Sequence, residues 1–170
     1  MRILAFSDLH CDLEQAARLT ELSADADVVI GAGDFASVHQ GLEATIDALS
    51  GIPTPTVLVP GNNETEIALR EAAAGWAAAT VLHGESTEIG GQVFYGLGGG
   101  IPTTPWSWSF DLDEAEAAMK LEDCPEDAFL VVHSPPRGHC DSGEGGPHFG
   151  SKAIFDAIEE SYAPPREIVA

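Results

Sequence analysis

Residues 2–10 read RILAFSDLH, and the rest of the chain repeats the pattern that this stretch begins. Residues 2–6 form a short, mostly apolar run that predicts a buried strand, and polar residues follow at once. Asp8 and His10 are two positions apart, so in an extended chain their side chains leave on the same face. A carboxylate beside an imidazole at the end of a buried strand makes half of a metal site.

We call the polar residues that directly follow a predicted strand its polar tip. The same order of strand, polar tip and helix recurs twice in the first half of the chain. Apolar runs predict strands at 28–31 and 56–59, and helical spacing predicts helices at 12–22, 42–49 and 64–74. The two further tips carry Asp34 and the pair Asn62 and Asn63. This alternation predicts the α/β class, with a parallel sheet and right-handed crossovers. Ligands bind beyond the carboxyl ends of such strands, where all three tips lie.

The second half has shorter elements. We expect short strands at 80–83 and 92–95 with a hairpin-like turn at 90–91, and helices at 113–121 and 151–160. The apolar run 128–132 predicts a buried strand that ends at His133, and the Gly/Pro-rich stretch 134–150 predicts a long loop. Residues 167–170 start what resembles one more strand.

Composition restricts the class of partner. Asp and Glu total 28 against 7 Lys and Arg, which gives a formal net charge of −21. Such a surface repels polyanions, so we expect no binding of nucleic acid or of an anionic membrane by charge. The excess of acidic residues also suggests a protein from a salt-loving organism whose cytoplasm screens the repulsion.

Length and cysteine usage indicate one intracellular domain. The 170 residues are enough for a single domain over 1–170, and no apolar run approaches the roughly 20 residues of a membrane span. Cys11, Cys124 and Cys140 form no Cys-x-x-Cys pair, which indicates reduced thiols and a cytoplasmic protein. The oligomeric state does not follow from the sequence.

Each polar tip has a structural explanation when it is taken alone. Asp34 follows a glycine and fits a turn, Asn63 fits the N-cap of the next helix, and His133 fits a hydrogen-bonded histidine at a strand end. Their joint occurrence, each at the carboxyl end of a predicted strand, is far more specific than any one of them.

This set of motifs resembles the calcineurin-like metallophosphoesterase family. The matching stretches are Asp8–His10, Gly31–Asp34, Gly61–Glu64 and Val131–Pro136. The resemblance implies a four-layer αββα sandwich that holds two divalent metal ions. It also implies that Asp8 and His10 bind the first ion, Asp34 bridges both, and Asn62 and His133 bind the second. A mixed Asp, His and Asn shell suits Mn²⁺, the expected ion, or Fe²⁺ or Zn²⁺ better than Ca²⁺ or Mg²⁺.

The implied function is hydrolysis of a small phosphate ester, most simply a phosphodiester, by a metal-activated hydroxide. The alternative is a non-catalytic interaction scaffold on the same fold, with the loop around Trp106 and Trp108 as its docking surface.

Two departures from the family pattern bear on activity. The residue after the Gly-Asn pair is a histidine in the family, thought to protonate the leaving group, and here it is Asn63. An amide cannot act as a general acid at neutral pH, although it can hydrogen-bond a phosphate oxygen. We therefore expect either substrates with good leaving groups or another group that supplies the proton. His148 is the candidate for contacting the substrate, with His139 second; the alternative for both is a solvated loop histidine.

The second departure concerns the last metal ligands. The family carries Gly-His-x-His after a late strand, and no such motif occurs in these residues. We therefore expect the chain to be C-terminally incomplete, with the last strands of the fold missing and this motif encoded just after Ala170.

Overall fold

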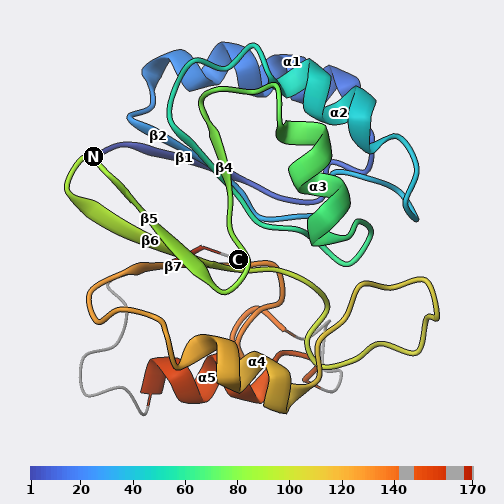
Figure 1. Ribbon diagram of the computed structural model, residues 1–170, viewed down its shortest axis with the longest axis vertical. Helices are drawn as coiled ribbons and strands as arrows, with labels where there is room; N and C mark the ends of the chain where they lie inside the picture. Colours follow the sequence, from blue (N-terminus) through green and yellow to red (C-terminus); the bar gives the residue numbers. More distant parts are fainter. Residues whose placement is uncertain (142–147, 160–166, 170) are drawn as a thin grey trace.

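Two four-stranded sheets lie face to face, and helices cover the outer face of each (Figure 1). This computed structural model describes residues 1–141, 148–159 and 167–169. In Figure 1 the four layers follow one another from helices α1 to α3, through the two sheets, to helices α4 and α5. The predicted α/β class with its αββα layering is confirmed.

The first sheet is entirely parallel, in the order β1-β2-β3-β4, as the strand–tip–helix repeat predicted. Its strands are β1 (Ile3–Phe6), β2 (Val28–Gly31), β3 (Thr56–Leu58) and β4 (Ala79–Val81). Its helices are α1 (Leu13–Leu22), the short 3-10 helix η1 (Ser23–Asp25), α2 (Leu42–Leu49) and α3 (Glu66–Ala73). Parallel strands place all their carboxyl ends at one edge of the sheet, which is where the polar tips lie.

The second sheet is mixed, in the order β5-β6-β7-β8. Its strands are β5 (Glu85–Ile89), β6 (Gln92–Leu97), β7 (Phe129–Val132) and β8 (Glu167–Val169), and its helices are α4 (Glu114–Leu121) and α5 (Lys152–Glu159). Strands β5 and β6 are antiparallel, and β6, β7 and β8 are parallel.

The core lies between the sheets and under both helix layers. Alternate residues of a strand face opposite sides, so Val28 and Ile30 pack toward the second sheet and Val29 packs under the helices. The rings of Phe94 and Phe129 stack in the layer between the sheets with their centroids 5.0 Å apart. Strands buried on both faces explain the continuous apolar runs in the sequence.

Two helix starts differ in how well the sequence predicted them. The helix predicted from residue 12 has Asp12 as its N-cap, since this carboxylate accepts from the N–H groups of Glu14 and Gln15 at 3.1 and 3.0 Å. Helix α3 begins at Glu66 rather than residue 64, and its N-cap is Thr65. The reading of Asn63 as an N-cap is therefore wrong.

The expected hairpin is longer than the sequence indicated. Strand β5 covers Glu85–Ile89 and pairs with β6 across the turn at Gly90 and Gly91. The stretch ESTEI has no apolar run, so its strand character comes from pairing with β6 rather than from its own pattern. The strand expected at 80–83 ends at Val81 and belongs to the first sheet, as β4.

No helix among the described residues has the length and apolar character that crossing a membrane requires.

Candidate metal centre

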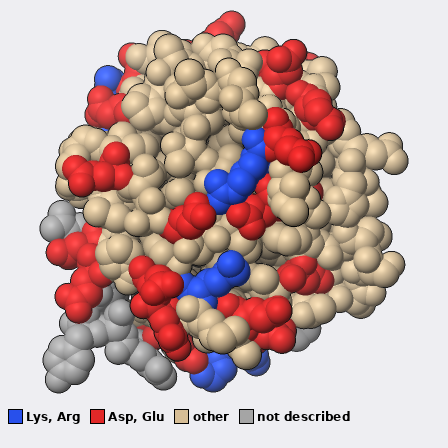
Figure 2. All heavy atoms as spheres, in the orientation of Figure 1, with Lys and Arg blue, Asp and Glu red and all other residues tan. Residues whose placement is uncertain are grey.

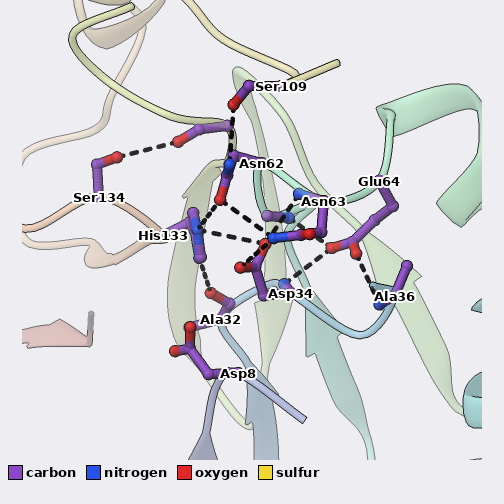
Figure 3. A network of polar contacts seen from close by, with 12 residues as sticks. Asp8, Ala32, Asp34, Ala36, Asn62, Asn63, Glu64, Ser109, His133 and Ser134 are labelled. Atoms are coloured by element: carbon purple, nitrogen blue, oxygen red, sulfur yellow. Dashed lines mark hydrogen bonds and ion pairs between the residues drawn. The ribbon is translucent and has the colours of Figure 1, made fainter. Parts of the chain in front are cut away.

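Five side chains from four strand ends meet at the carboxyl edge of the sheets. Asp8 and His10 follow β1, Asp34 follows β2, Asn62 follows β3 and His133 follows β7. Figure 3 shows Asp8, Asp34, Asn62 and His133 around one point, with Asp34 deepest among them. The structure thus brings together all five residues that the sequence suggested as metal ligands.

Asp8 and His10 reach the site by a route that differs from the expected one. They are not in extended chain, because their φ angles are 57° and 44°, in the left-handed region. Hydrogen bonds from their own N–H groups to the carbonyls of Gly33 and Asp34, at 3.0 and 2.9 Å, hold this turn against the loop after β2. The two side chains are adjacent because of the turn, not because of strand alternation.

Strained backbone concentrates in these two loops. Eight non-glycine residues of the described chain have positive φ. Six of them lie in the loops after β1 and β2: Asp8, His10, Cys11, Asp34, Val38 and His39. Such conformations cost free energy and persist where the surrounding structure enforces them, which is typical of functional sites.

The first half of the site consists of Asp8, His10 and Asp34. Their ligand atoms lie within 4.8 Å of one another. His10 Nε2 is 3.6 Å from Asp8 Oδ1 and 3.5 Å from Asp34 Oδ2. The other ring nitrogen, Nδ1, lies 3.2 Å from the carbonyl oxygen of Ala36. A carbonyl only accepts, so Nδ1 donates to it, and Nε2 is the ring nitrogen that faces the two carboxylates.

The second half of the site, made of Asp34, Asn62 and His133, also contains a histidine whose Nδ1 contacts a backbone carbonyl. His133 Nδ1 donates to the carbonyl oxygen of Ala32 at 2.9 Å, and its Nε2 is the ring nitrogen that faces the site. That nitrogen lies 3.5 Å from Asp34 Oδ1 and 3.4 Å from Asn62 Oδ1. The two oxygens of Asp34 therefore face different halves of the site, one toward His10 and one toward His133.

This donor set fits a pair of divalent cations. The ring nitrogens and side-chain oxygens that converge at 3.4–3.6 Å are of the types that bind divalent transition-metal cations. Ligands about 2.1 Å from a tetrahedral metal lie roughly 3.4 Å apart, which matches these separations. A backbone carbonyl that accepts from the other ring nitrogen of each histidine is the usual arrangement for a metal-binding imidazole.

Two glycines allow the loops to approach this closely. Gly33 has a φ of +93°, and a Cβ on it would lie 2.7 Å from His133 Nδ1. A Cβ on Gly61 would lie 2.1 Å from both the backbone nitrogen and a side-chain oxygen of Asp34. Any larger residue at either position would displace Asp34 or His133, which explains the Gly-Asp and Gly-Asn pairs in the sequence.

Asn63 holds Asp34 rather than facing solvent. Its backbone N–H donates to Asp34 Oδ1 at 2.9 Å, and its Nδ2 donates to Asp34 Oδ2 at 2.6 Å. Its own side-chain oxygen accepts from the N–H of Val38 at 2.9 Å. Each carboxylate oxygen of Asp34 keeps a second lone pair for a cation.

Glu64 is a residue of the site that the sequence analysis missed. It is 1% exposed, and its carboxylate accepts from the N–H groups of Asp34, Ala36 and Gly61 at 2.9, 2.9 and 2.6 Å (Figure 3). Burial raises the pKa of this carboxyl group, and the hydrogen bonds from Ala36 and Gly61 act in the opposite direction. One side chain thereby ties the loop after β2 to the loop after β3.

Ser109 is the other missed residue, because it comes from the loop between β6 and α4. Its hydroxyl accepts from Asn62 Nδ2 at 2.8 Å and donates to Asp111 Oδ1 at 2.6 Å. The amide of Asn62 is thus oriented with its NH₂ toward Ser109 and its oxygen toward His133.

The other suggested histidine contacts have different surroundings. His148, suggested as a substrate contact, pairs through Nδ1 with Asp141 Oδ1 at 2.7 Å. His139 stacks on Phe155, with ring centroids 6.0 Å apart. In the described part of the chain, no hydrogen bond or ion pair joins either imidazole to Asp34, Asn62 or His133. A role for either in substrate binding stays a prediction.

Asp141 gives a prediction on pH dependence. Burial would raise the pKa of its carboxyl group, but hydrogen bonds from the Gly138 N–H, the His148 ring and the Gly150 N–H outweigh it and lower the pKa to about 2. A lowered folded-state pKa means that the carboxylate stabilises the fold above its ordinary value of 3.8 and loses this effect as the pH falls toward 2. We expect Asp141→Asn to lower the Tm at neutral pH and to match the wild type near pH 2.

The measurement is thermal unfolding of both proteins between pH 2 and pH 7. Asp123→Asn, the same change at an exposed position, is the control and should leave the profile unaltered. A difference between Asp141→Asn and the wild type that is constant over this range would contradict the assignment.

Comparisons with known proteins agree with this geometry. The family model of the calcineurin-like phosphoesterase superfamily domain matches residues 1–145. The crystal structure of TT1561 of Thermus thermophilus superposes with a TM-score of 0.74 at 22% identity, covering 94% of this chain and 77% of that one. Another crystal structure superposes with a TM-score of 0.79 at 16% identity, covering 96% and 80%. At these identities the two structures establish the fold alone. No curated protein matches the chain closely enough to serve as a relative.

Proposed function

The chain belongs to the calcineurin-like phosphoesterase superfamily, and we propose from this premise that it hydrolyses small phosphodiesters with two divalent cations. The observation that carries the proposal is the convergence of imidazole nitrogens, carboxylates and an amide oxygen on the two sides of Asp34. Such an arrangement provides suitable ligands for divalent cations. The whole chain, 1–170, is proposed as one catalytic domain.

We propose the ligands as the sequence suggested them. Asp8 and His10 hold one cation, Asn62 and His133 hold the other, and Asp34 gives one oxygen to each. Mn²⁺ is the expected ion, with Fe²⁺ and Zn²⁺ as alternatives. Cations bound there supply Lewis-acid activation of water and neutralise charge on the transferring phosphoryl group.

The role of Asn63 sets the proposed substrate range. Its side chain donates to Asp34 and its amide has no proton to release at neutral pH. A positioned general acid contributes about 10²–10⁴-fold to the rate, so its absence handicaps esters whose leaving group needs a proton. Esters of acidic alcohols, such as nitrophenols, depart without one.

The test is a hydrolysis assay with two substrates. We expect protein stripped of metal to be inactive on bis-p-nitrophenyl phosphate and to gain activity on addition of Mn²⁺. We also expect an alkyl phosphodiester, glycerophosphocholine, to be hydrolysed at least about 100-fold more slowly, since no general acid assists its leaving group.

Two outcomes would contradict these proposals. Equal rates on the two substrates would show that another group supplies the proton. Inertness of the full-length gene product with Mn²⁺, Fe²⁺ and Zn²⁺ alike would favour the non-catalytic scaffold instead.

The acidic surface supports a further prediction. Acidic side chains are spread over the face shown in Figure 2, with few basic ones between them. Repulsion among charges at a net −21 is screened when the Debye length falls from about 10 Å at 0.1 M salt to about 3 Å at 1 M. We therefore expect the Tm to rise as KCl is raised from 0.1 to 1 M, measured by thermal unfolding. An equal Tm at both concentrations would count against adaptation to salt.

A further inference from the structure

Two tryptophans stack on each other at the surface, in the loop between β6 and α4. The ring centroids of Trp106 and Trp108 are 5.6 Å apart and their planes differ by 13°. Trp106 is 53% exposed although Trp108 covers one side of its ring. Most of the remaining indole surface of Trp106 is therefore open to a ligand.

Hydrogen bonds attach this loop to the candidate metal centre. The residue after Trp108 is Ser109, whose hydroxyl accepts from the side chain of Asn62 at 2.8 Å. The next residue, Phe110, donates its N–H to the carbonyl oxygen of Asn62 at 3.0 Å. Consecutive Cα atoms are about 3.8 Å apart, so the backbone of Trp108 lies one residue from a group that touches a proposed ligand.

Hydrogen bonds within the segment 104–111 stabilise the turn that carries Trp106 and Trp108. The carboxylate of Asp111 accepts from the N–H and the hydroxyl of Thr104, at 2.7 and 2.8 Å. Its other oxygen accepts from the hydroxyl of Ser109 at 2.6 Å. The two ends of the segment 104–111 are thus fixed to each other, so a ligand would meet an aromatic surface that is already ordered.

The loop after β2 is joined to the loop that carries the tryptophans. The ring of His39 donates to the carbonyl oxygen of Trp108, which joins the two loops. Its neighbour Val38 is 43% exposed and has a φ of 47°, a strained conformation for a β-branched residue. Val38 is held in this conformation by its N–H bond to the side chain of Asn63, at 2.9 Å. Strain of this kind is typical of ligand-binding loops.

From these contacts we infer that Trp106 and Trp108 form a platform for the flat aromatic part of a phosphate ester bound at the metal centre. The ligand class that fits is a nucleotide, with its phosphate at Asp34 and its base on the indole of Trp106. A nucleobase is flat and uncharged, so the acidic surface does not oppose its approach, and every base has a π-face for stacking. The inference names a substrate class for the proposed function, and its link to catalysis rests on that proposal.

The experiment compares two ligands that differ only in the base. The affinities of the full chain for adenosine 5′-monophosphate and ribose 5-phosphate are measured by isothermal titration calorimetry in the presence of Mn²⁺. Stacking of one base contributes about 5- to 150-fold in affinity, so the nucleotide should bind tighter by a factor in this range. Equal affinities would overturn the inference, and would leave the loop free to serve a protein partner instead.

Three variants identify the surface responsible. Trp106→Ala should remove the preference for the nucleotide, and Trp106→Phe, which keeps an aromatic face, should retain most of it. Ile67→Ala removes an apolar side chain that is 70% exposed on α3 and should leave the preference unchanged. A preference that survives Trp106→Ala would place the base elsewhere and overturn the inference. Circular dichroism of each variant checks that the fold is intact.

Failure of this inference and failure of the proposed function are distinguishable. The preference is a ratio of two affinities, so weak metal binding lowers both and leaves the ratio intact. A protein that prefers the nucleotide through Trp106 but hydrolyses no phosphodiester would support the platform and reject the catalytic proposal. A protein that hydrolyses bis-p-nitrophenyl phosphate without any preference for the nucleotide would do the reverse.

Discussion

Asp34→Asn should abolish metal-dependent hydrolysis, with a fall in rate of at least about a thousandfold, or roughly 4 kcal/mol of transition-state stabilisation. Asp34 faces His10 with one oxygen and His133 with the other, at 3.5 Å in both cases. An asparagine of the same shape offers only one oxygen, and its NH₂ group would point at the second cation. The substitution should therefore remove the charge and the bridge together.

The number of bound ions gives a readout that does not depend on catalysis. We expect equilibrium dialysis to find two Mn²⁺ per wild-type chain and one or none in Asp34→Asn. Asp47→Asn makes the same chemical change at an exposed position of α2 and should leave both the rate and the number of ions unchanged. Retention of two ions by Asp34→Asn would show that this residue is not the bridge.

Of the variants proposed here, Glu64→Ala should lower the free energy of unfolding most. In Glu64→Ala, the N–H groups of Asp34, Ala36 and Gly61 lose their acceptor in a buried place. Each buried donor without a partner costs about 1–3 kcal/mol, and water entering the space left by the side chain offsets part of this. We expect the free energy of unfolding to fall by about 3–5 kcal/mol, measured by urea denaturation.

Two further variants separate this effect from a general loss of charge. Glu64→Gln keeps the size and one acceptor oxygen, so it should cost about half as much as Glu64→Ala. Glu71→Ala removes an exposed carboxylate of α3, and should change the stability by less than about 0.5 kcal/mol. A Glu64→Ala protein as stable as Glu71→Ala would mean that the three N–H groups find other partners.

The sequence predicted the positions of residues that depend on the order of the strands. It predicted few of the hydrogen bonds between residues far apart in the sequence. Asp8, Asp34 and Asn62 were placed correctly at one edge because the parallel strands of the first sheet bring their carboxyl ends together. The α/β class followed from the same pattern, the family resemblance implied the αββα layering, and the class, the layering and the family are confirmed. The assignment of each residue to a particular cation stays a prediction.

The residues that were missed act through partners far away in the sequence. Glu64 accepts from Asp34, 30 positions earlier, and Ser109 meets Asn62 across 47 positions. No local pattern marks either contact, and the local pattern around Asn63 and Glu64 suggested a helix start instead. The helix begins two residues later because both side chains are bound to the loop after β2.

The centre draws its residues from both sheets, and this has a consequence for the order of folding. Asp8, His10, Asp34 and Asn62 follow strands of the first sheet, whereas His133 follows β7 of the second. His133 reaches the carbonyl of Ala32 across 101 positions, so the second half of the chain must be docked before the site is complete. Under the proposed function, we therefore expect the cation bound by Asn62 and His133 to be taken up late in folding, after the two sheets have docked, and to stabilise their contact.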